Sequence, residues 1–429
     1  MRYTQLSSTF YTAARTRFAA QLKKGGLAII NSNDTYPTSA DGHLPFKQAA
    51  DIFYLSGVDQ EESILLVFPD AFHAQHREIL FLKETSELIA IWEGAKLSKE
   101  QAREQTGVKT IMWLTEFEKT LRLLLAEASC VYLNDNPHMR ATVEVETREM
   151  RFSKWFREKF PHFQIERSAP LLYELRAVKD KEEIAQLQKA IDITRSGFER
   201  VTKFVKPGVM EYELEAEYMH EFLRKGSRGF SYTPIIASGE SACVLHYVDN
   251  NKPCKDGDLL LMDVGAEYGN YCADMTRCIP VNGKFSARQK EVYNAVLRVM
   301  QGAKNLLKPG IFMHEYHKAV GEMMTKELVD LKLITTDDVK NENKDWPAYK
   351  KYFMHGTSHF LGIDVHDVGH WHKPVQEGNV FTVEPGIYIP AEGLGIRIEN
   401  NIVIGKNGND DMFKDFLTEV EEIEDFMNS

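Results

Sequence analysis

The chain has 429 residues, of which 43% are hydrophobic and 27% are charged, a composition typical of globular proteins with room for two domains. Its 52 basic and 63 acidic residues give a net charge of −11, which argues against nucleic acid or an anionic membrane as a partner. No apolar run is long enough to cross a bilayer, the N-terminus lacks the apolar core of a signal peptide, and the five cysteines form no Cys-x-x-Cys pair, so we expect a cytoplasmic protein with reduced thiols.

Residues 1–172 alternate between helical and strand-like segments, which is typical of an α/β domain. Helices are expected over 9–23, where Gly25 and Gly26 follow, and over 114–127. Short apolar runs predict the strands, and these runs are GLAII from Gly26, DIFYLSGV from Asp51, SILLVFPD from Ser63, REILFLK from Arg77 and CVYLND from Cys130. This part of the chain contains no catalytic constellation.

A second domain is expected over 173–429, beginning with a long amphipathic helix that carries apolar residues from Ile184 to Phe198 on one face and ends at VKPG. Another long helix begins at Ser286, which forms an S-x-x-Q capping box with Gln289, and ends at LKPG. After each Pro-Gly come a further helix and a pair of strands. This repetition predicts an internal duplication of a helix–helix–sheet unit.

Each copy of this unit contributes two carboxylates in or beside apolar strands: Asp263 and Asp274, then Glu384 and Glu399. Aspartate is depleted in strands, and burying an unpaired carboxylate costs several kcal/mol. Four clustered carboxylates repel one another and do not all ionise unaided, whereas two divalent cations would balance their charge. The alternative interpretation is four polar residues that are satisfied separately at turns.

Five histidines lie in HGTSHFLGIDVHDVGHWH (355–372), a segment that is glycine-rich at its start and favours strand or loop over helix. It lacks the glutamate of the HExxH zinc motif. One histidine is available to complete a metal site, and the alternative is a solvated polar loop. His246 lies beside an apolar run and is by itself typical of a core or surface histidine. HEYH (314–317) is interpreted as helix surface.

The motifs DVGAEYGNYCADMTR, HGTSHFLGIDVHD, VEPGIYI and GIRIENN resemble the signatures of Xaa-Pro aminopeptidases (aminopeptidases P). These belong to the pita-bread metallopeptidase family, with prolidase, methionine aminopeptidase and creatinase. DIFYLSGVDQEESILLVFPD also resembles the N-terminal domain of aminopeptidase P. The resemblance implies a two-domain α/β and α+β protein, with a creatinase/aminopeptidase P-like domain that serves oligomerisation or substrate access and a duplicated pita-bread catalytic domain.

Carried over by motif, the resemblance implies a site with two divalent metal ions, most simply Mn²⁺, with Co²⁺ or Zn²⁺ as alternatives. Their implied ligands are Asp263, Asp274, His359, Glu384 and Glu399. Catalytic roles are implied for Glu384, His246 and His366, and substrate contacts for His355, Val365, Tyr388 and Arg397. The family pattern has Ile-Glu-Asp where this chain has Ile398-Glu399-Asn400.

The expected reaction is hydrolysis of the bond before a proline at the second position of a peptide, by a hydroxide that bridges the two metal ions. Glu384 acts there as general base and then acid, and His246 or His366 donates to the oxyanion. A prolidase that cleaves only Xaa-Pro dipeptides is the alternative, and a non-catalytic pita-bread binding protein is a more remote one. By analogy we expect a homodimer or homotetramer in which the N-terminal domain borders a neighbour's cleft.

Overall fold

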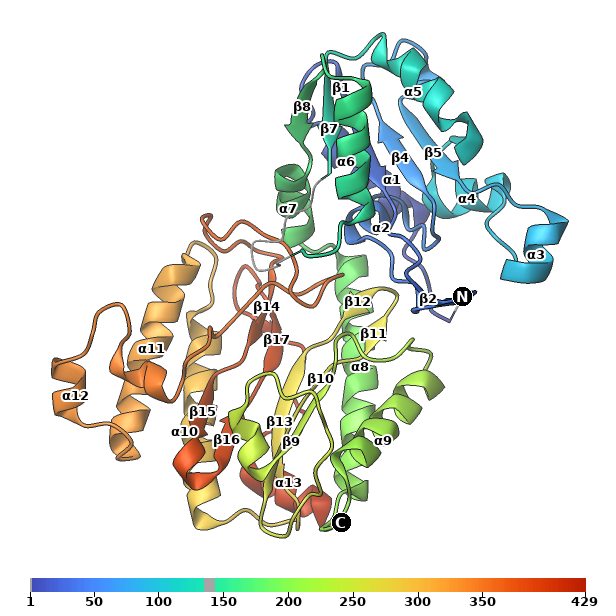
Figure 1. The fold of residues 1–429 in the computed structure, drawn as a ribbon. Coiled ribbons are helices and arrows are strands. Elements are labelled where there is room, and N and C mark those ends of the chain that lie inside the picture. The colour runs from blue at the N-terminus through green and yellow to red at the C-terminus, as the bar shows by residue number, and fades with distance from the viewer. Residues whose placement is uncertain (1, 135–142) are drawn as a thin grey trace. The chain divides into compact units, whose positions relative to one another are not determined.

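The computed structural model describes residues 2–134 and 143–429, which form two compact units (Figure 1). One unit comprises Gln5–Arg176, and the other comprises Ala177–Ser429 with the N-terminal residues up to Thr4. The domain boundary expected from sequence, at 172/173, lies a few residues before this division. Among the described residues, no helix combines the length and hydropathy that a membrane crossing requires.

The N-terminal unit is built on a mixed six-stranded sheet with the order β6-β5-β4-β1-β7-β8. Strand β1 pairs antiparallel with β4 and parallel with β7. All residues of these three strands are buried, as expected for continuous apolar runs. The strands of this unit are β1 (Gly26–Asn31), β2 (Pro37–Ser39), β3 (Gly42–His43), β4 (Ile64–Val67), β5 (Glu78–Leu82), β6 (Thr110–Trp113), β7 (Cys130–Leu133) and β8 (Gln164–Arg167).

Four of the five predicted strands of this unit are confirmed, whereas the strand predicted from Asp51 is wrong. This run forms helix α2 and ends at Gly57, whose φ of 70° is left-handed. All seven residues of α2 are buried, so the segment is enclosed on every side and its sequence shows neither helical nor strand periodicity. The helices of this unit are α1 (Ser8–Ala19), α2 (Ala50–Ser56), α3 (Glu87–Glu93), α4 (Lys99–Thr106), α5 (Phe117–Leu125), α6 (Arg148–Lys159) and α7 (Ala169–Ala177), with short 3₁₀ turns η1 (Ala74–His76) and η2 (Leu114–Glu116).

The C-terminal unit contains the predicted duplication. Each half begins with two packed helices, and Figure 1 shows the pair α8/α9 and the pair α10/α11 on opposite sides of the strands. The predicted capping box is confirmed, because Ser286 Oγ accepts from Gln289 N and Gln289 Oε1 accepts from Ser286 N. The helices are α8 (Lys181–Phe204), α9 (Glu211–Arg224), α10 (Ala287–Leu306), α11 (Met313–Asp330), α12 (Thr336–Lys340) and α13 (Val420–Met427), with 3₁₀ turns η3 (Gly239–Cys243), η4 (Ala348–Lys351) and η5 (Pro390–Glu392).

Each half then contributes a three-stranded sheet, with the order β13-β10-β9 in the first half and β14-β17-β18 in the second. Two small hairpins, β11-β12 and β15-β16, accompany them. The strands are β9 (Ile235–Ser238), β10 (Leu259–Val264), β11 (Glu267–Tyr268), β12 (Tyr271–Cys272), β13 (Met275–Pro280), β14 (Val380–Val383), β15 (Gly386–Ile389), β16 (Leu394–Arg397), β17 (Asn400–Val403) and β18 (Asp410–Asp411).

Candidate active site

The four predicted acidic residues lie at the ends of these paired strands. Asp263 is the penultimate residue of β10 and faces Thr276 across the ladder. Asp274 directly precedes β13, and Glu399 directly precedes β17. Glu384 directly follows β14, whose last residue is paired with the first residue of β17. The duplicated strand pairs therefore present their carboxylates at corresponding ends.

Hydrogen bonds from one side chain and from the backbone join the two halves beside Asp274 and Glu399. The Asn401 side chain accepts from Asp274 N at 3.2 Å and donates to Asp274 O at 2.6 Å. Glu399 N donates to Thr276 O at 3.1 Å. Because these bonds fix β13 against β17, the side chains of Asp274 and Glu399 converge.

His359 completes a buried group with these two residues. Asp274, His359 and Glu399 each offer a ligand atom, and the three atoms lie within 4.8 Å of one another. His359 Nε2 lies 3.4 Å from Asp274 Oδ2 and 3.6 Å from Glu384 Oε1. His359 Nδ1 lies 2.9 Å from Phe360 O, so a proton on Nδ1 leaves the Nε2 lone pair free for a metal ion.

Tyr232 connects the remaining carboxylate to the group. Its hydroxyl lies 2.5 Å from Asp263 Oδ1 and 2.7 Å from Asp274 Oδ1. One hydroxyl proton serves only one acceptor at a time, so Tyr232 alone does not neutralise the repulsion between the two carboxylates.

Arg397 supplies a positive charge behind the carboxylates. Its guanidinium donates to Asp263 Oδ2 at 2.7 Å, to Thr276 Oγ1 at 3.1 Å and to the Tyr388 hydroxyl at 2.8 Å. Thr276 in turn donates to Glu399 Oε2 at 2.7 Å. Arg397 therefore orients the carboxylates from behind the site.

His355 and Glu384 lie beside Tyr388. His355 Nε2 is 2.8 Å from the Tyr388 hydroxyl, and His355 Nδ1 is 3.9 Å from Glu384 Oε2. The Glu384 side chain keeps 19% of its surface exposed, whereas Glu399 is 1% exposed. Of the two glutamates, Glu384 is the one that a substrate can reach.

Burial dominates the electrostatics of the site. Burial, together with the charges of Asp274 and Asp263, raises the pKa of Glu384 to about 7 despite the nearby His359 and Arg397. Burial likewise raises the pKa of Asp263 and, with the neighbouring carboxylates, lifts the pKa of Glu399 well above its usual range. For His355, burial and the charge of Arg397 lower the pKa to about 3, so its imidazole is neutral.

The donor set fits divalent cations. Glu399 Oε1 is buried and, among the described residues, has no hydrogen-bond partner. Arg397 offers one full positive charge against four carboxylates, so the group has an excess of negative charge in a buried place. Carboxylate oxygens with one imidazole nitrogen are ligands suited to hard or borderline divalent ions. Cations would satisfy the unpartnered oxygen and the charge together.

The other predicted site residues lie in loops around this cluster. The His366 ring is exposed and lies edge-on to His359, with 4.4 Å between ring centroids. Val365 precedes it and is half-buried. His246 is exposed, and its charge contributes to lowering the pKa of His355, which brings it to the same side of the cluster. As predicted, residues 355–372 contain no helix.

Sequence reasoning missed several residues of the site. Tyr232 lies outside the motifs used in the sequence interpretation, and Thr276 lies within DVGAEYGNYCADMTR but was given no role. HEYH lies on helix α11, where His314 and Glu315 are exposed as predicted, but Tyr316 is fully buried with its hydroxyl 2.9 Å from Ser358 Oγ. Thr357 N also donates to His317 Nδ1 at 3.4 Å. The position of Tyr316 on one face of an amphipathic helix, beside exposed residues, was the sequence pattern that predicts a buried side chain.

Two family matches cover most of the chain. Residues 185–406 match metallopeptidase family M24, and residues 11–132 match the N-terminal domain of aminopeptidase P. The chain therefore belongs to metallopeptidase family M24.

Full-length relatives narrow this assignment to the Xaa-Pro aminopeptidases of that family. An Xaa-Pro aminopeptidase of Escherichia coli K12 is 35% identical, covering 99% of this chain and 98% of the relative. Xaa-Pro aminopeptidase 3 of Homo sapiens is 31% identical, covering 92% of this chain and 80% of the relative. The solved structure of zinc-substituted E. coli aminopeptidase P with product matches with a TM-score of 0.89 at 33% identity, and 99% of each chain is covered. The resemblance and the two-domain fold predicted from sequence are confirmed.

Proposed function

We propose that this protein removes the N-terminal residue from peptides that have proline at the second position. One observation carries the proposal: the five residues predicted as ligands, Asp263, Asp274, His359, Glu384 and Glu399, form one connected group that is buried or half-buried and has unused acceptor atoms. The whole-length similarity to Xaa-Pro aminopeptidases supports the choice of substrate.

These five residues would hold two divalent ions, which we take to be Mn²⁺, with Co²⁺ or Zn²⁺ as alternatives. When bound, such ions acidify a water molecule and polarise the scissile carbonyl. Asp274 and Glu399, which lie where the duplicated halves meet, would be among the residues that hold these ions, together with His359. Arg397, Thr276 and Tyr232 hold the ligand carboxylates in place.

Glu384 is the general base and then the general acid in this proposal. Its partial exposure and its raised pKa suit a group that takes a proton from water and passes it to the leaving nitrogen at neutral pH. His246 and His366 are both exposed beside the cluster, where either can donate a hydrogen bond to the developing oxyanion.

The proline side of the substrate would meet His355, Val365 and Tyr388. Proline has no N–H and a fixed φ, so its recognition needs a shaped wall and no acceptor for that nitrogen. His355 is neutral, and its Nε2 lies 2.8 Å from the hydroxyl of Tyr388, which is fully buried and so supports the wall from its inner side. Arg397 supports this wall through Tyr388.

The oligomeric state and location are also proposals. We infer a homodimer or homotetramer, in which the N-terminal unit supplies subunit contacts or limits access to the cleft. Helix α3 supports self-association, because Leu88, Ile91 and Trp92 on it are 65%, 77% and 82% exposed. A cytoplasmic location fits the five free cysteines, four of which are buried.

The test compares an Xaa-Pro-Yaa tripeptide, the matching Xaa-Pro dipeptide and an Xaa-Ala-Yaa tripeptide, each with Mn²⁺ and after chelation. Metal-dependent cleavage of the proline tripeptide alone, or faster than that of the dipeptide, supports the proposal. Cleavage of the dipeptide alone means prolidase. Absence of turnover by protein that has bound Mn²⁺ refutes a peptidase role and favours a non-catalytic binding protein.

A further inference from the structure

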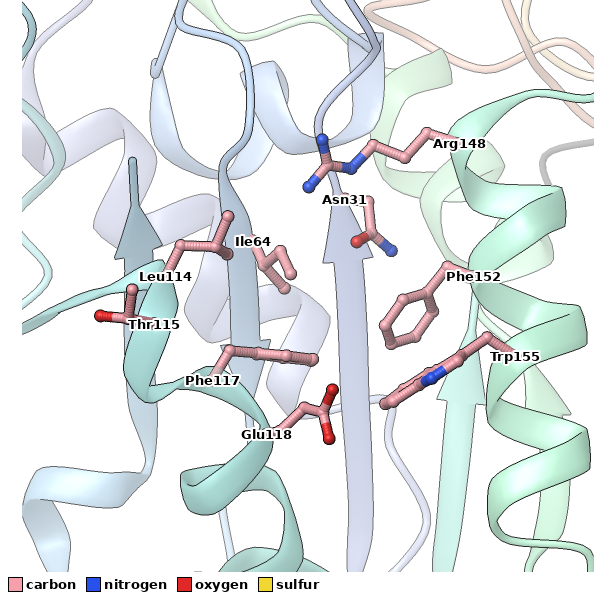
Figure 2. Close-up of a pocket in the computed structure, with 9 residues that line it drawn as sticks. All are labelled: Asn31, Ile64, Leu114, Thr115, Phe117, Glu118, Arg148, Phe152 and Trp155. Carbon is pink, nitrogen blue, oxygen red and sulfur yellow. The ribbon is translucent and has the colours of Figure 1, made fainter. Parts of the chain in front are cut away.

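The N-terminal unit contains a cavity of about 450 Å³ beside strand β1 (Figure 2). This volume is in the range of small-molecule sites, roughly 300–1,000 Å³. Figure 2 shows three aromatic side chains around it: Phe117 from α5, and Phe152 and Trp155 from α6. Phe152 and Trp155 are both half-buried. All the residues that line the cavity come from the N-terminal unit, and none belongs to the carboxylate cluster.

A buried acceptor in this cavity has no partner. Asn31, which is 1% exposed, donates to Glu149 through its backbone N at 2.7 Å and through Nδ2 at 2.8 Å. These bonds fix the orientation of the amide. Within the part of the chain that the structure describes, Asn31 Oδ1 is buried without a hydrogen bond. Figure 2 shows this oxygen on the side of Ile64 and Phe117. Such an unpartnered acceptor destabilises the folded protein unless an N–H or O–H reaches it.

Opposite charges lie at the two ends of the cavity. In Figure 2 the guanidinium of Arg148 lies beyond Asn31, and the carboxylate of Glu118 lies at the other end, below Phe117 and Trp155. Among the residues that the structure describes, Glu118 pairs with Arg122 alone, at 3.9 Å, and the two side chains are 62% and 58% exposed. Exposed pairs of this kind contribute little to stability, so the Glu118 carboxylate is free to bind another cation.

We propose that this cavity binds a short peptide with free ends and an aromatic side chain. A peptide N–H donates to Asn31 Oδ1, the ammonium group pairs with Glu118 and the carboxylate pairs with Arg148. The aromatic side chain packs against Phe152 and Trp155. A purely apolar compound would leave Asn31 Oδ1 unpartnered and both charges unused, so the combination of groups selects a peptide.

The test is a ¹⁹F NMR titration of the full-length protein labelled with fluorotryptophan, using the peptide Ala-Phe-Ala, which lacks proline at the second position. The chain has five tryptophans, and a Trp155→Phe variant identifies the resonance of Trp155. We expect this resonance to shift saturably. Glu118→Gln and N-acetylation of the peptide should each weaken binding about two- to fivefold, without adding to each other, because they remove the same contact. Arg148→Gln and C-terminal amidation should behave as a second such pair.

The matched control is Arg157→Gln, an exposed residue on the same helix as Arg148, which should leave the affinity unchanged. A Trp155 resonance that stays unmoved while the peptide saturates another site would overturn the proposal. So would equal binding of the native, acetylated and amidated peptides, which would indicate a site for any aromatic compound. A Trp155 shift that follows protein dilution alone would assign the cavity to a second copy of the chain and would also overturn it.

Discussion

Glu183 offers a sharp test of how burial sets the energetics of the C-terminal unit. It is 1% exposed near the start of α8, where it accepts from Asp180 N at 2.8 Å and from the Tyr271 hydroxyl at 3.1 Å. Its positive neighbour Lys179 is already paired with Asp367 at 2.8 Å. Burial outweighs the charge of Lys179 and the hydrogen bonds, and raises the pKa of Glu183 to about 7.

The raised pKa of Glu183 determines whether the free energy of unfolding rises or falls with pH. Below about pH 4.5 the carboxyl group is protonated in both folded and unfolded states. As the pH rises from there to about 7, only the unfolded state releases the proton, so the free energy of unfolding falls. At 1.36 kcal/mol per pKa unit, the interval from 4.5 to about 7 amounts to about 3 kcal/mol.

Glu183→Gln keeps the shape of the side chain and removes its charge. We expect the variant to be more stable than the wild type by up to about 3 kcal/mol near pH 8, with a difference that shrinks toward pH 5. Urea unfolding across this pH range measures it. Glu199→Gln, an exposed site on the same helix, is the control and should show no such pH dependence. A difference that does not change with pH, or a wild type that is more stable near pH 8, would refute the reasoning.

Three further predictions concern the candidate metal site and its surroundings. Mn²⁺ at about 100 times its Kd should raise the free energy of unfolding of the metal-free protein by about 2.7 kcal/mol, as measured by thermal unfolding. The Glu399→Gln variant should lose most of this gain. At saturating Mn²⁺, Glu384→Gln should lower kcat on an Xaa-Pro-Yaa peptide about 10²–10⁴-fold, whereas the exposed control Glu377→Gln should not; equal losses would contradict the assignment of the base. Asn400→Asp should destabilise the protein by about 1–3 kcal/mol in urea at neutral pH, because Asn400 Nδ2 donates to both oxygens of Asp411 at 2.8 and 2.9 Å; an unchanged midpoint would contradict this.

Local chemistry accounts for what the sequence could predict. Ser286 and Gln289 signal a helix start through contacts within a few residues, and the structure contains that capping box. Asp263 in an apolar strand was an equally local anomaly, since a buried carboxylate requires a partner nearby. The internal duplication showed that Asp263 belongs to a larger set of carboxylates. Asp274 and Glu399 precede corresponding strands of the two halves, so they meet at the junction between the halves.

Other features depend on contacts between segments that are distant in sequence. The run that begins at Asp51 is buried on all sides in its helix, so no alternation of polar and apolar residues within the run distinguishes a helix from a strand. Tyr232 reaches Asp263 and Asp274 from a segment with no regular structure, and Tyr316 meets Ser358 from a helix that sequence interpretation treated as surface. Such partners become visible only when the chain is folded.

The hydrogen bonds of the site also indicate which atoms are left for metal ions. Arg397 and Tyr232 engage both oxygens of Asp263, and Tyr232 engages one oxygen of Asp274. Thr276 engages one oxygen of Glu399. The second oxygens of Asp274 and Glu399 remain, and they lie beside the free nitrogen of His359. Hydrogen bonds thus fix the position of each of these carboxylates, while the second oxygens of Asp274 and Glu399 are left for cations. Buried oxygens of this kind destabilise the folded protein when no cation is bound and stabilise it when cations bind to them.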